Sequence, residues 1–367
     1  MMSSVNMKDG MNYAPISQSK PVVKPGEYCF AAACLDHGHI YGMCNGLIEA
    51  GATLKWVYDP SPEKVAAFIS RYPQAKAARD LQEILDDPAI QLVAAAAIPN
   101  ERASLGIQVM KAGKHYFTDK GPFTTLEQLE QVKQVYAETK KKYAVYYSER
   151  LHVESAVYAD QLIKQGAIGK VVQMIGFGPH RLNAPSRPDW FFKKEQYGGI
   201  LADIASHQIE QFLYFSGNND AKIISSTVGN FNNKQYPELE DFGDAHLIGE
   251  NGAVGYVRVD WLTPDGLRTW GDGRTVLLGT EGYIELRKYV NIGAGDGGDH
   301  VFLVNQQGEK YIKVSGLTGY PYFGQLILDT LQETEYAMTQ EHVFKTAELT
   351  LLAQNQALRI EHKAPLI

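Results

Sequence analysis

The stretch that decides the fold is YCFAAACLDHGHIYGMCNGLIEAGATLKWVYD, residues 28–59. Its first eight residues form an apolar run that predicts a buried strand. After a turn, apolar side chains recur at helical spacing, and Gly51 supplies a C-cap. Residues 53–59 predict a second strand. Strand, helix and strand in this order predict a βαβ unit, in which the two strands are parallel and the helix crosses one face of the sheet.

The same alternation continues to residue 147. Further helices are expected at residues 61–70, 81–85, 101–112 and 125–140, with Asp80 and Asn100 as N-caps of the second and third. Further strands are expected near residue 75 and at residues 92–98, 115–119 and 143–147. The sequence therefore predicts an α/β fold that begins with a Rossmann-type, doubly wound parallel sheet.

After residue 150 the pattern changes to one helix, at 153–165, and then to mostly longer strands. Glycine-rich turns at 249–252, 279–282 and 293–298 separate strand-like segments, and helices are expected at 323–338 and 341–361. We therefore expect residues 1–25 to form a flexible arm, 26–149 the Rossmann domain, and 150–367 an α+β domain with a large, mostly antiparallel sheet.

Composition excludes several classes of function. The 367 residues hold 35 basic and 42 acidic side chains, a net charge of −7 that gives no electrostatic reason to bind nucleic acid or anionic lipid. The longest apolar run is far shorter than the roughly 18 residues that cross a bilayer, and the first 25 residues lack the features of a signal peptide. We expect a soluble, cytoplasmic protein that binds neither nucleic acid nor membrane.

The three cysteines are clustered at apolar positions, which is typical of reduced core thiols. They are Cys29, Cys34 and Cys44. Neither CxxC nor HxxxH occurs, and the His37/His39 pair is expected to belong to a turn. We therefore expect neither a disulfide nor a metal site.

The turn after the first strand indicates what the first domain binds. On the G-x-G-x-x-G frame of Rossmann domains, Gly38 takes the second position, while Asp36 and Tyr41 replace the first and third glycines. Gly38 still allows the backbone to approach a pyrophosphate closely, whereas Tyr41 is expected to loosen the packing of the helix. The residues expected to line a dinucleotide in this turn are Asp36, His37, Gly38, His39 and Ile40.

Asp59 ends the second strand at the spacing of the carboxylate that accepts hydrogen bonds from the adenosine ribose. Its charge favours NAD over NADP, because a 2′-phosphate would meet like charge and no arginine follows. The alternative is that Asp59 only stabilises the turn before the next helix. The run at 293–298 fits G-x-G-x-x-G literally, but it lies between two strand-like segments and is expected to be a β-connection.

Three segments together resemble the Gfo/Idh/MocA oxidoreductase family. They are GKHYFTDKGPFTTLEQL (113–129), SERLHVESAVYADQLIKQGAIGKV (148–171) and GGILADIASHQIEQFLYFSG (198–217). With the first turn and Asp59, the resemblance covers residues 27–217. It implies a dehydrogenase that transfers a hydride between NAD and a secondary hydroxyl of a sugar, inositol or related polyol. It also implies a homo-oligomer, a dimer or tetramer, formed through the C-terminal sheet.

The resemblance assigns catalytic roles to three residues. Lys120 stands where the family has the lysine of Glu-Lys-Pro, beside the nicotinamide and substrate, although this chain has Asp119 and Gly121 on either side. Asp203 and His207 are four apart on an expected helix, so they share one face. Lys120 would polarise the reacting oxygen, His207 would take the hydroxyl proton, and Asp203 would support the histidine. The alternatives are a surface lysine, a surface charge pair and a structural histidine.

The remaining candidates line the expected cofactor and substrate sites. The turn at Ile98, Pro99 and Asn100 and the strand end at Asp119 and Lys120 are expected to contact the cofactor, although Ala103 replaces a family histidine nearby. The expected substrate contacts are Arg150, His180, Arg187, Trp190, Asp203 and His207. Two other functions remain open: an NAD-retaining enzyme without net redox change, which cleaves or eliminates through transient oxidation, and a sugar sensor that has lost turnover.

Overall fold

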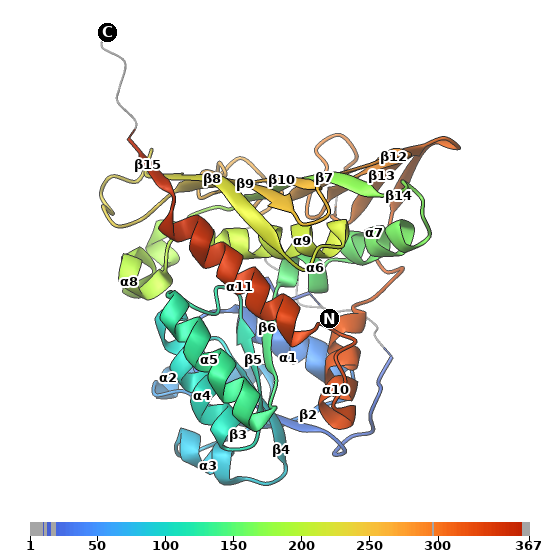
Figure 1. The fold of residues 1–367 in the computed structure, drawn as a ribbon. Coiled ribbons are helices and arrows are strands. Elements are labelled where there is room, and N and C mark those ends of the chain that lie inside the picture. Colours follow the sequence, from blue (N-terminus) through green and yellow to red (C-terminus); the bar gives the residue numbers. More distant parts are fainter. Residues whose placement is uncertain (1–9, 11–12, 16–19, 296, 362–367) are drawn as a thin grey trace. The chain divides into compact units, whose positions relative to one another are not determined.

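The computed structural model of the chain describes residue 10 and residues 13–15, 20–295 and 297–361. The chain divides into two compact units (Figure 1). Of the described residues, the first unit holds those from Tyr13 to Tyr146 together with Gly319–Phe344, and the second holds Gly10, those from Tyr147 to Thr318 and those from Lys345 to Glu361. Each unit has its own sheet.

The first unit is built on a six-stranded sheet in the order β3-β2-β1-β4-β5-β6. All neighbouring strands are parallel. The strands are β1 (Cys29–Ala33), β2 (Thr53–Tyr58), β3 (Lys76–Ala77), β4 (Ile90–Ala95), β5 (His115–Asp119) and β6 (Tyr143–Tyr146). This is the doubly wound Rossmann order, so the predicted fold is confirmed, and ligands of such sheets bind where the order reverses, beside β1 and β4.

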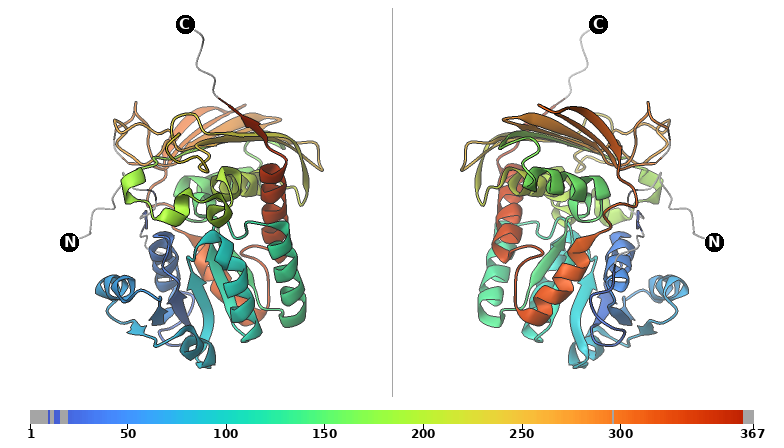
Figure 2. Two further views of the ribbon diagram at one scale, coloured as in Figure 1. Left: turned by 90° about the vertical axis from the view of Figure 1, so that its left-hand side faces the viewer. Right: turned by 90° about the vertical axis from the view of Figure 1, so that its right-hand side faces the viewer.

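The helices of the first unit cover both faces of this sheet (Figure 2). They are α1 (His39–Glu49), α2 (Pro62–Arg71), α3 (Leu81–Asp86), α4 (Arg102–Lys111), α5 (Leu126–Thr139) and α10 (Pro321–Gln332). Asp80 caps α3 as predicted, because its carboxylate accepts a hydrogen bond from the Glu83 N–H at 2.9 Å. The predicted cap at Asn100 is wrong, because a 3₁₀ turn, Pro99–Glu101, comes before α4.

Two distant segments complete the first unit. Helix α10 lies against α1, and a Cβ on Gly46 would come within 2.4 Å of the Phe323 ring. The helix predicted at 323–338 ends earlier, at Gln332, because Glu333 takes a left-handed backbone conformation. In the segment expected to be a flexible arm, Ala14 is buried and the Val22 N–H donates to the Ala50 carbonyl at 2.9 Å.

The second unit is built on a nine-stranded sheet in the order β14-β13-β12-β11-β7-β10-β9-β8-β15. The strands are β7 (Val171–Pro179), β8 (Ala221–Gly229), β9 (Phe242–Gly249), β10 (Val254–Asp260), β11 (Arg274–Gly279), β12 (Gly282–Arg287), β13 (His300–Asn305), β14 (Gly308–Lys313) and β15 (Leu358–Ile360). Two neighbouring pairs, β7 with β10 and β8 with β15, are parallel, and the others are antiparallel. The predicted large, mostly antiparallel sheet is confirmed.

The second half of the chain differs from expectation in the length of its last helix and agrees with it in the glycine-rich connection. The last predicted helix, 341–361, is too long: α11 (Gln340–Asn355) stops and the chain continues as β15, which pairs with β8. The glycine run at 293–298 connects β12 to β13, as predicted, with residue 296 outside the described part. In the first unit, Cys29, Cys34 and Cys44 carry free thiols. Cys44 is buried, as expected of a core thiol, whereas Cys29 and Cys34 are partly exposed, so the core position predicted for them is wrong.

Helices of the second unit lie along one face of its sheet (Figure 1). They include α6 (Ser148–Leu151), α7 (Glu154–Lys164), α8 (Lys194–Tyr197) and α9 (Ser206–Ser216). Glycines in the strands let α9 approach closely: a Cβ on Gly178 would lie 2.6 Å from the Gln208 amide nitrogen, and one on Gly255 would lie 2.8 Å from the Phe212 ring. The sheet thereby fixes the position of α9.

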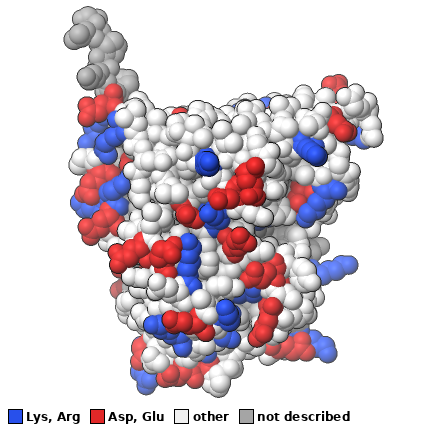
Figure 3. Space-filling model, viewed as in Figure 1, with Lys and Arg blue, Asp and Glu red and all other residues white. Residues whose placement is uncertain are grey.

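The surface charge agrees with the composition. Acidic and basic side chains are interspersed over the face shown in Figure 3. Among the residues that the structure describes, no helix has both the length and the hydropathy needed to span a bilayer.

We predict that Gly255→Ala destabilises the protein by about 1–3 kcal/mol, because the added methyl group would overpack against the buried Phe212 ring. Urea denaturation followed by circular dichroism measures this change. Gly266→Ala is the matched control, because nothing lies within 4 Å of its Cβ position. Equal stability of the two variants would show that α9 does not depend on this close contact.

Candidate functional site

The turn after β1 and the start of α1 form the first part of the site. The His37 N–H donates to the Ala96 carbonyl at 3.0 Å, which fastens the turn to the end of β4. Gly38 is the N-cap of α1 and offers no side chain to cap the helix. The N–H groups of the first helical turn and the helix dipole therefore favour an anion at this point, as a dinucleotide pyrophosphate requires.

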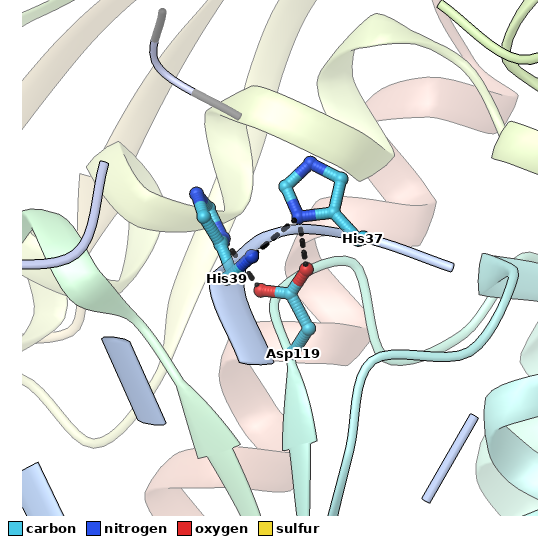
Figure 4. A group of neighbouring side chains, drawn as sticks. All are labelled: His37, His39 and Asp119. Atoms are coloured by element: carbon cyan, nitrogen blue, oxygen red, sulfur yellow. Dashed lines mark hydrogen bonds and ion pairs between the residues drawn. The ribbon is translucent and has the colours of Figure 1, made fainter. Parts of the chain in front are cut away.

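The carboxylate of Asp119, at the end of β5, binds four donors, and Figure 4 shows the two that are histidines. Oδ1 accepts hydrogen bonds from His39 Nδ1 at 2.8 Å and from the Lys120 N–H at 2.7 Å. Oδ2 lies 3.0 Å from His37 Nδ1 and 3.4 Å from the Arg102 guanidinium. Burial alone would raise the pKa of Asp119, but His39, His37 and Arg102 hold it well below its ordinary value. Asp119 is therefore a buried carboxylate.

His37, His39 and Asp119 have the composition of a metal site, and their ligand atoms lie within 4.8 Å of one another. However, each Asp119 oxygen already has two donors, one of which is the Arg102 cation. A divalent metal would displace these donors and meet a like charge. We therefore interpret the group as a hydrogen-bonded cluster, and name it the Asp119 cluster.

Arg102 was not identified from the sequence, because an arginine at the start of a helix is usually exposed. Here it is buried, and its Nε donates to the Ala97 carbonyl at 2.7 Å. The guanidinium also donates to the carbonyls of Lys120 and Gly121. Arg102 thus joins the ends of β4 and β5 and fixes the backbone that carries Lys120. Gly121 has φ of +67°, which the ring of a proline cannot adopt, so the departure from Glu-Lys-Pro has a structural reason.

Asp59 stabilises two turns in this structure. Its Oδ2 accepts a hydrogen bond from the Leu35 N–H at 2.6 Å, and its Oδ1 accepts one from the Ser61 N–H at 2.9 Å. The turn-forming alternative is thus present, but a carboxylate has about four acceptor positions, so capacity for ribose hydroxyls remains. Lys64, which the sequence did not suggest, lies 2.6 Å from Asp36 and 3.8 Å from Asp59. Burial would lower the pKa of Lys64, but Asp36 raises it.

Two further features fit a bound dinucleotide. The Oδ1 atom of Asn100 is buried without a hydrogen-bond partner among the described residues, in the turn that also holds Ile98 and Pro99. Tyr41 does not loosen α1, because its ring stacks on Phe68 of α2 with centroids 5.7 Å apart. The close contact expected of the third glycine is made by Gly42, whose Cβ would lie 2.7 Å from a tyrosine hydroxyl of β6.

Asp203 and His207 belong to the second unit and are both buried. Asp203 lies in a π-helical turn, Leu201–Ala205, and not in the predicted α-helix, which begins only at Ser206. Side chains cap this irregular start: Gln354 Oε1 accepts from the Leu201 N–H at 2.9 Å. π-turns of this kind are frequent at functional sites. The His207 ring lies edge-on to a tyrosine ring of the same unit, Tyr147, with centroids 6.4 Å apart.

Buried ion pairs hold the helix that carries His207. Glu149 accepts hydrogen bonds from Lys288 Nζ at 2.7 Å and from Gln208 Nε2 at 2.8 Å. Arg150, a predicted substrate contact, instead donates to both oxygens of Glu210 at 2.7 and 2.9 Å and lies 3.7 Å over the ring of Tyr214. These contacts account for its burial, and a substrate contact for Arg150 stays a prediction.

An aromatic cluster follows the ends of β7 and β10. The two strands are parallel, with Pro179 opposite Asp260, so the residues after them emerge at the same edge. The His180 ring lies 5.2 Å from Trp261 and 4.5 Å from Trp270. Around them lie Phe191 and Arg187, whose guanidinium is 5.2 Å from the Trp261 ring, while Trp190 is half-buried beside Phe191. Trp261 was missed because the parallel pairing of β7 with β10 brings it to the predicted residues, and Trp270 was missed because it reaches them from the loop before β11, where its carbonyl accepts a hydrogen bond from the Arg181 N–H at 2.7 Å.

Comparison with known proteins gives the same division of the chain. The family model described as "Oxidoreductase family, NAD-binding Rossmann fold" matches residues 40–147, and the one described as "GFO/IDH/MocA C-terminal domain" matches residues 156–285. The first match confirms the predicted NAD-binding Rossmann domain.

Named relatives share part of the chain. It is 26% identical over 149 residues to D-xylose dehydrogenase of Paenarthrobacter nicotinovorans, which covers 39% of this chain and 38% of that protein. It is 28% identical over 241 residues to the NAD(+)-dependent scyllo-inositol 2-dehydrogenase of Bacillus subtilis (strain 168), covering 64% and 66%. A crystal structure from Erwinia carotovora atroseptica SCRI1043, named only as an oxidoreductase, is 49% identical with a TM-score of 0.89 and covers 91% of this chain and 100% of that one.

We predict that Lys64→Met raises the Kd of NADPH about tenfold, equivalent to about 1.4 kcal/mol, while the Kd of NADH changes little. Without the ammonium, Asp36 and Asp59 present uncompensated charge to a 2′-phosphate. Fluorescence titration measures both constants. Lys55→Met is the control, because Lys55 forms a 2.6 Å ion pair with Asp87 elsewhere in the same unit. An equal change for both cofactors would exclude a role for Lys64 in cofactor choice.

Proposed function

Because the chain belongs to the Gfo/Idh/MocA family of oxidoreductases, we propose that it transfers a hydride between a secondary hydroxyl of a sugar, inositol or related polyol and NAD. The observation that carries this function is the fixed position of Lys120. It lies at the carboxyl end of β5, at the binding edge of a Rossmann sheet, and both its backbone N–H and its carbonyl are held by the Asp119 cluster and Arg102.

The residues that would hold the cofactor come from the ends of three strands. The first turn of α1 would receive the pyrophosphate, Asp59 the adenosine ribose, and Asn100 a polar group through its unpartnered oxygen. Bound NAD supplies the hydride acceptor.

The chemical roles of the protein side chains follow from their acid–base properties. The imidazole of His207 takes the proton of the reacting hydroxyl, and the carboxylate of Asp203 favours the imidazolium that results. The ammonium of Lys120 donates a hydrogen bond to the same oxygen and stabilises its developing negative charge. Lys120 belongs to the first unit, and Asp203 and His207 belong to the second.

The aromatic cluster of the second unit supports a sugar or polyol as the substrate. Flat indole faces beside polar donors suit the alternating C–H and O–H groups of such molecules. His180, Arg187 and Trp190 are proposed to contact the substrate, together with Trp261 and Trp270. The two curated relatives, named for D-xylose and scyllo-inositol, fit the same class.

We predict that Lys120→Ala lowers kcat by at least about 100-fold, the usual contribution of a positioned acid–base group, while NADH still binds. The test is a screen of NAD reduction against aldoses and polyols, with NADH fluorescence and circular dichroism as controls. Lys111→Ala, an exposed lysine of the same unit, should behave as wild type. An unchanged rate in Lys120→Ala would remove this lysine from the mechanism. Product formed without net NADH would instead indicate redox-neutral chemistry.

The outer face of the nine-stranded sheet supports the expected homo-oligomer. One row of mostly apolar side chains crosses five neighbouring strands in register, at Ile248, Val254, Gln173, Leu278 and Tyr283. The exposed fractions of the four apolar members are 37–43%. A continuous exposed apolar row favours association of two sheets.

We predict that the wild-type protein is a dimer or tetramer and that Leu278→Asp shifts it toward the monomer, because a carboxylate would be buried in the interface. Light scattering after size-exclusion chromatography measures the mass. Leu331→Asp, an equally exposed position on α10, is the control. A wild-type monomer would refute this assembly.

A further inference from the structure

Two histidines of the cofactor turn are oriented by one carboxylate. His37 precedes the N-cap of α1 and His39 is the first residue of the helix. Their Nδ1 atoms lie 3.0 and 2.8 Å from the two oxygens of Asp119, and their side chains are 8% and 12% exposed. The general role of this turn, a backbone cradle for pyrophosphate, does not require either imidazole.

The Asp119 cluster orients both rings. Because Asp119 is ionised and accepts hydrogen bonds, the Nδ1 of His39, 2.8 Å away, carries a hydrogen. The Nδ1 of His37 lies between Asp119 Oδ2 at 3.0 Å and the backbone N–H of His39, which donates to it at 3.3 Å. Figure 4 shows that the second nitrogen, Nε2, of both rings points away from Asp119. In a neutral imidazole whose Nδ1 carries the hydrogen, as in His39, this Nε2 can only accept a hydrogen bond, whereas in an imidazolium it donates one.

A pyrophosphate offers only acceptors and carries negative charge, so it favours the donor form. The charged groups that face the two histidines are Asp119, Arg102 and Lys120. Asp119 on β5 and Arg102 on α4 carry opposite charges, and Lys120 lowers the pKa of His37. The Tyr146 ring of β6 lies edge-on to His39 with centroids 5.8 Å apart. Protonation of one imidazole would therefore add net positive charge where the helix N-terminus already favours an anion.

We propose that His37 and His39, held by Asp119, form a proton-linked phosphate clamp, in which binding of the dinucleotide is coupled to uptake of one proton by the pair. This rests on the proposed function, because it requires the dinucleotide to bind at α1. One proton is expected and not two, because the ring centroids are 4.3 Å apart and two imidazolium ions would repel each other.

The sign of the pH dependence follows from linkage. In the free protein, burial and the neighbouring His39 lower the pKa of His37 to about 3, so this ring is neutral at neutral pH. In the complex, the phosphate charge raises the pKa of the imidazole that takes the proton. Between the free and the bound pKa values the Kd of NADH increases with pH, by up to tenfold per pH unit for one linked proton. Above the bound value the dependence disappears.

Titration calorimetry measures this proton uptake directly. NADH is titrated into the full chain by calorimetry at pH 7 in buffers of different ionisation enthalpy, and the Kd is measured by fluorescence from pH 6 to pH 8. We expect uptake approaching one proton and a Kd that rises across this range. His37→Asn or His39→Asn should abolish the uptake, according to which ring is protonated, and Asp119→Asn should abolish it and weaken binding at pH 6.

His115→Asn is the matched control, because His115 is a buried histidine at the other end of the same strand as Asp119 and should leave the proton linkage intact. If Asp119→Asn does not fold, the two histidine variants decide. NADH binding with no proton uptake and a constant Kd would overturn the clamp but leave the proposed function standing. No NADH binding at any pH would overturn both. Competition by micromolar Zn²⁺ that is lost in His39→Asn would assign the cluster to a metal and overturn the clamp.

Discussion

The first unit depends on one buried charge, the carboxylate of Asp119. Burying an ionised group costs several kcal/mol unless donors replace the lost water. Here the donors come from three places in the sequence: the turn after β1, the start of α4 and the backbone beyond β5. Because all of them must converge on the same two oxygens, the cofactor turn and the strand end with Lys120 are held in one arrangement. The binding edge of the sheet is thus held in place by the protein's own hydrogen bonds and ion pairs.

The second unit reaches a comparable rigidity by a different route. Its sheet carries glycines where α9 crosses, so the helix lies close to the strands, and Glu149 and Glu210 fasten it through buried ion pairs. The irregular π-turn that carries Asp203 is supported by side chains from α11 and from the loop before β9. A departure from ideal helix geometry needs this support, since the sequence around it would otherwise form an ordinary α-helix.

The sequence predicts what depends on local pattern. The alternation of strands and helices predicts the parallel Rossmann sheet, and Asp80 is recognised as an N-cap from its position before a helical pattern. Lys120, Asp203 and His207 are proposed from motifs that resemble those of the family. The rest depends on contacts between distant residues. Arg102 looks like a surface residue until two strand ends surround it with carbonyls. Trp261 joins His180 only because β7 and β10 run parallel, and the effect of Tyr41 was misjudged because Gly42, one residue later, makes the close contact.

Gly319–Phe344 belongs to the first unit although it follows the second unit in sequence, and this affects folding during synthesis. Helix α10 packs on α1, so this side of the first unit is incomplete until residues 321–332 have left the ribosome. A fragment that stops after β6 would expose the apolar side of α1 to water. The first unit can therefore complete its folding only after most of the second unit has been synthesised, even though each unit has a sheet and a core of its own.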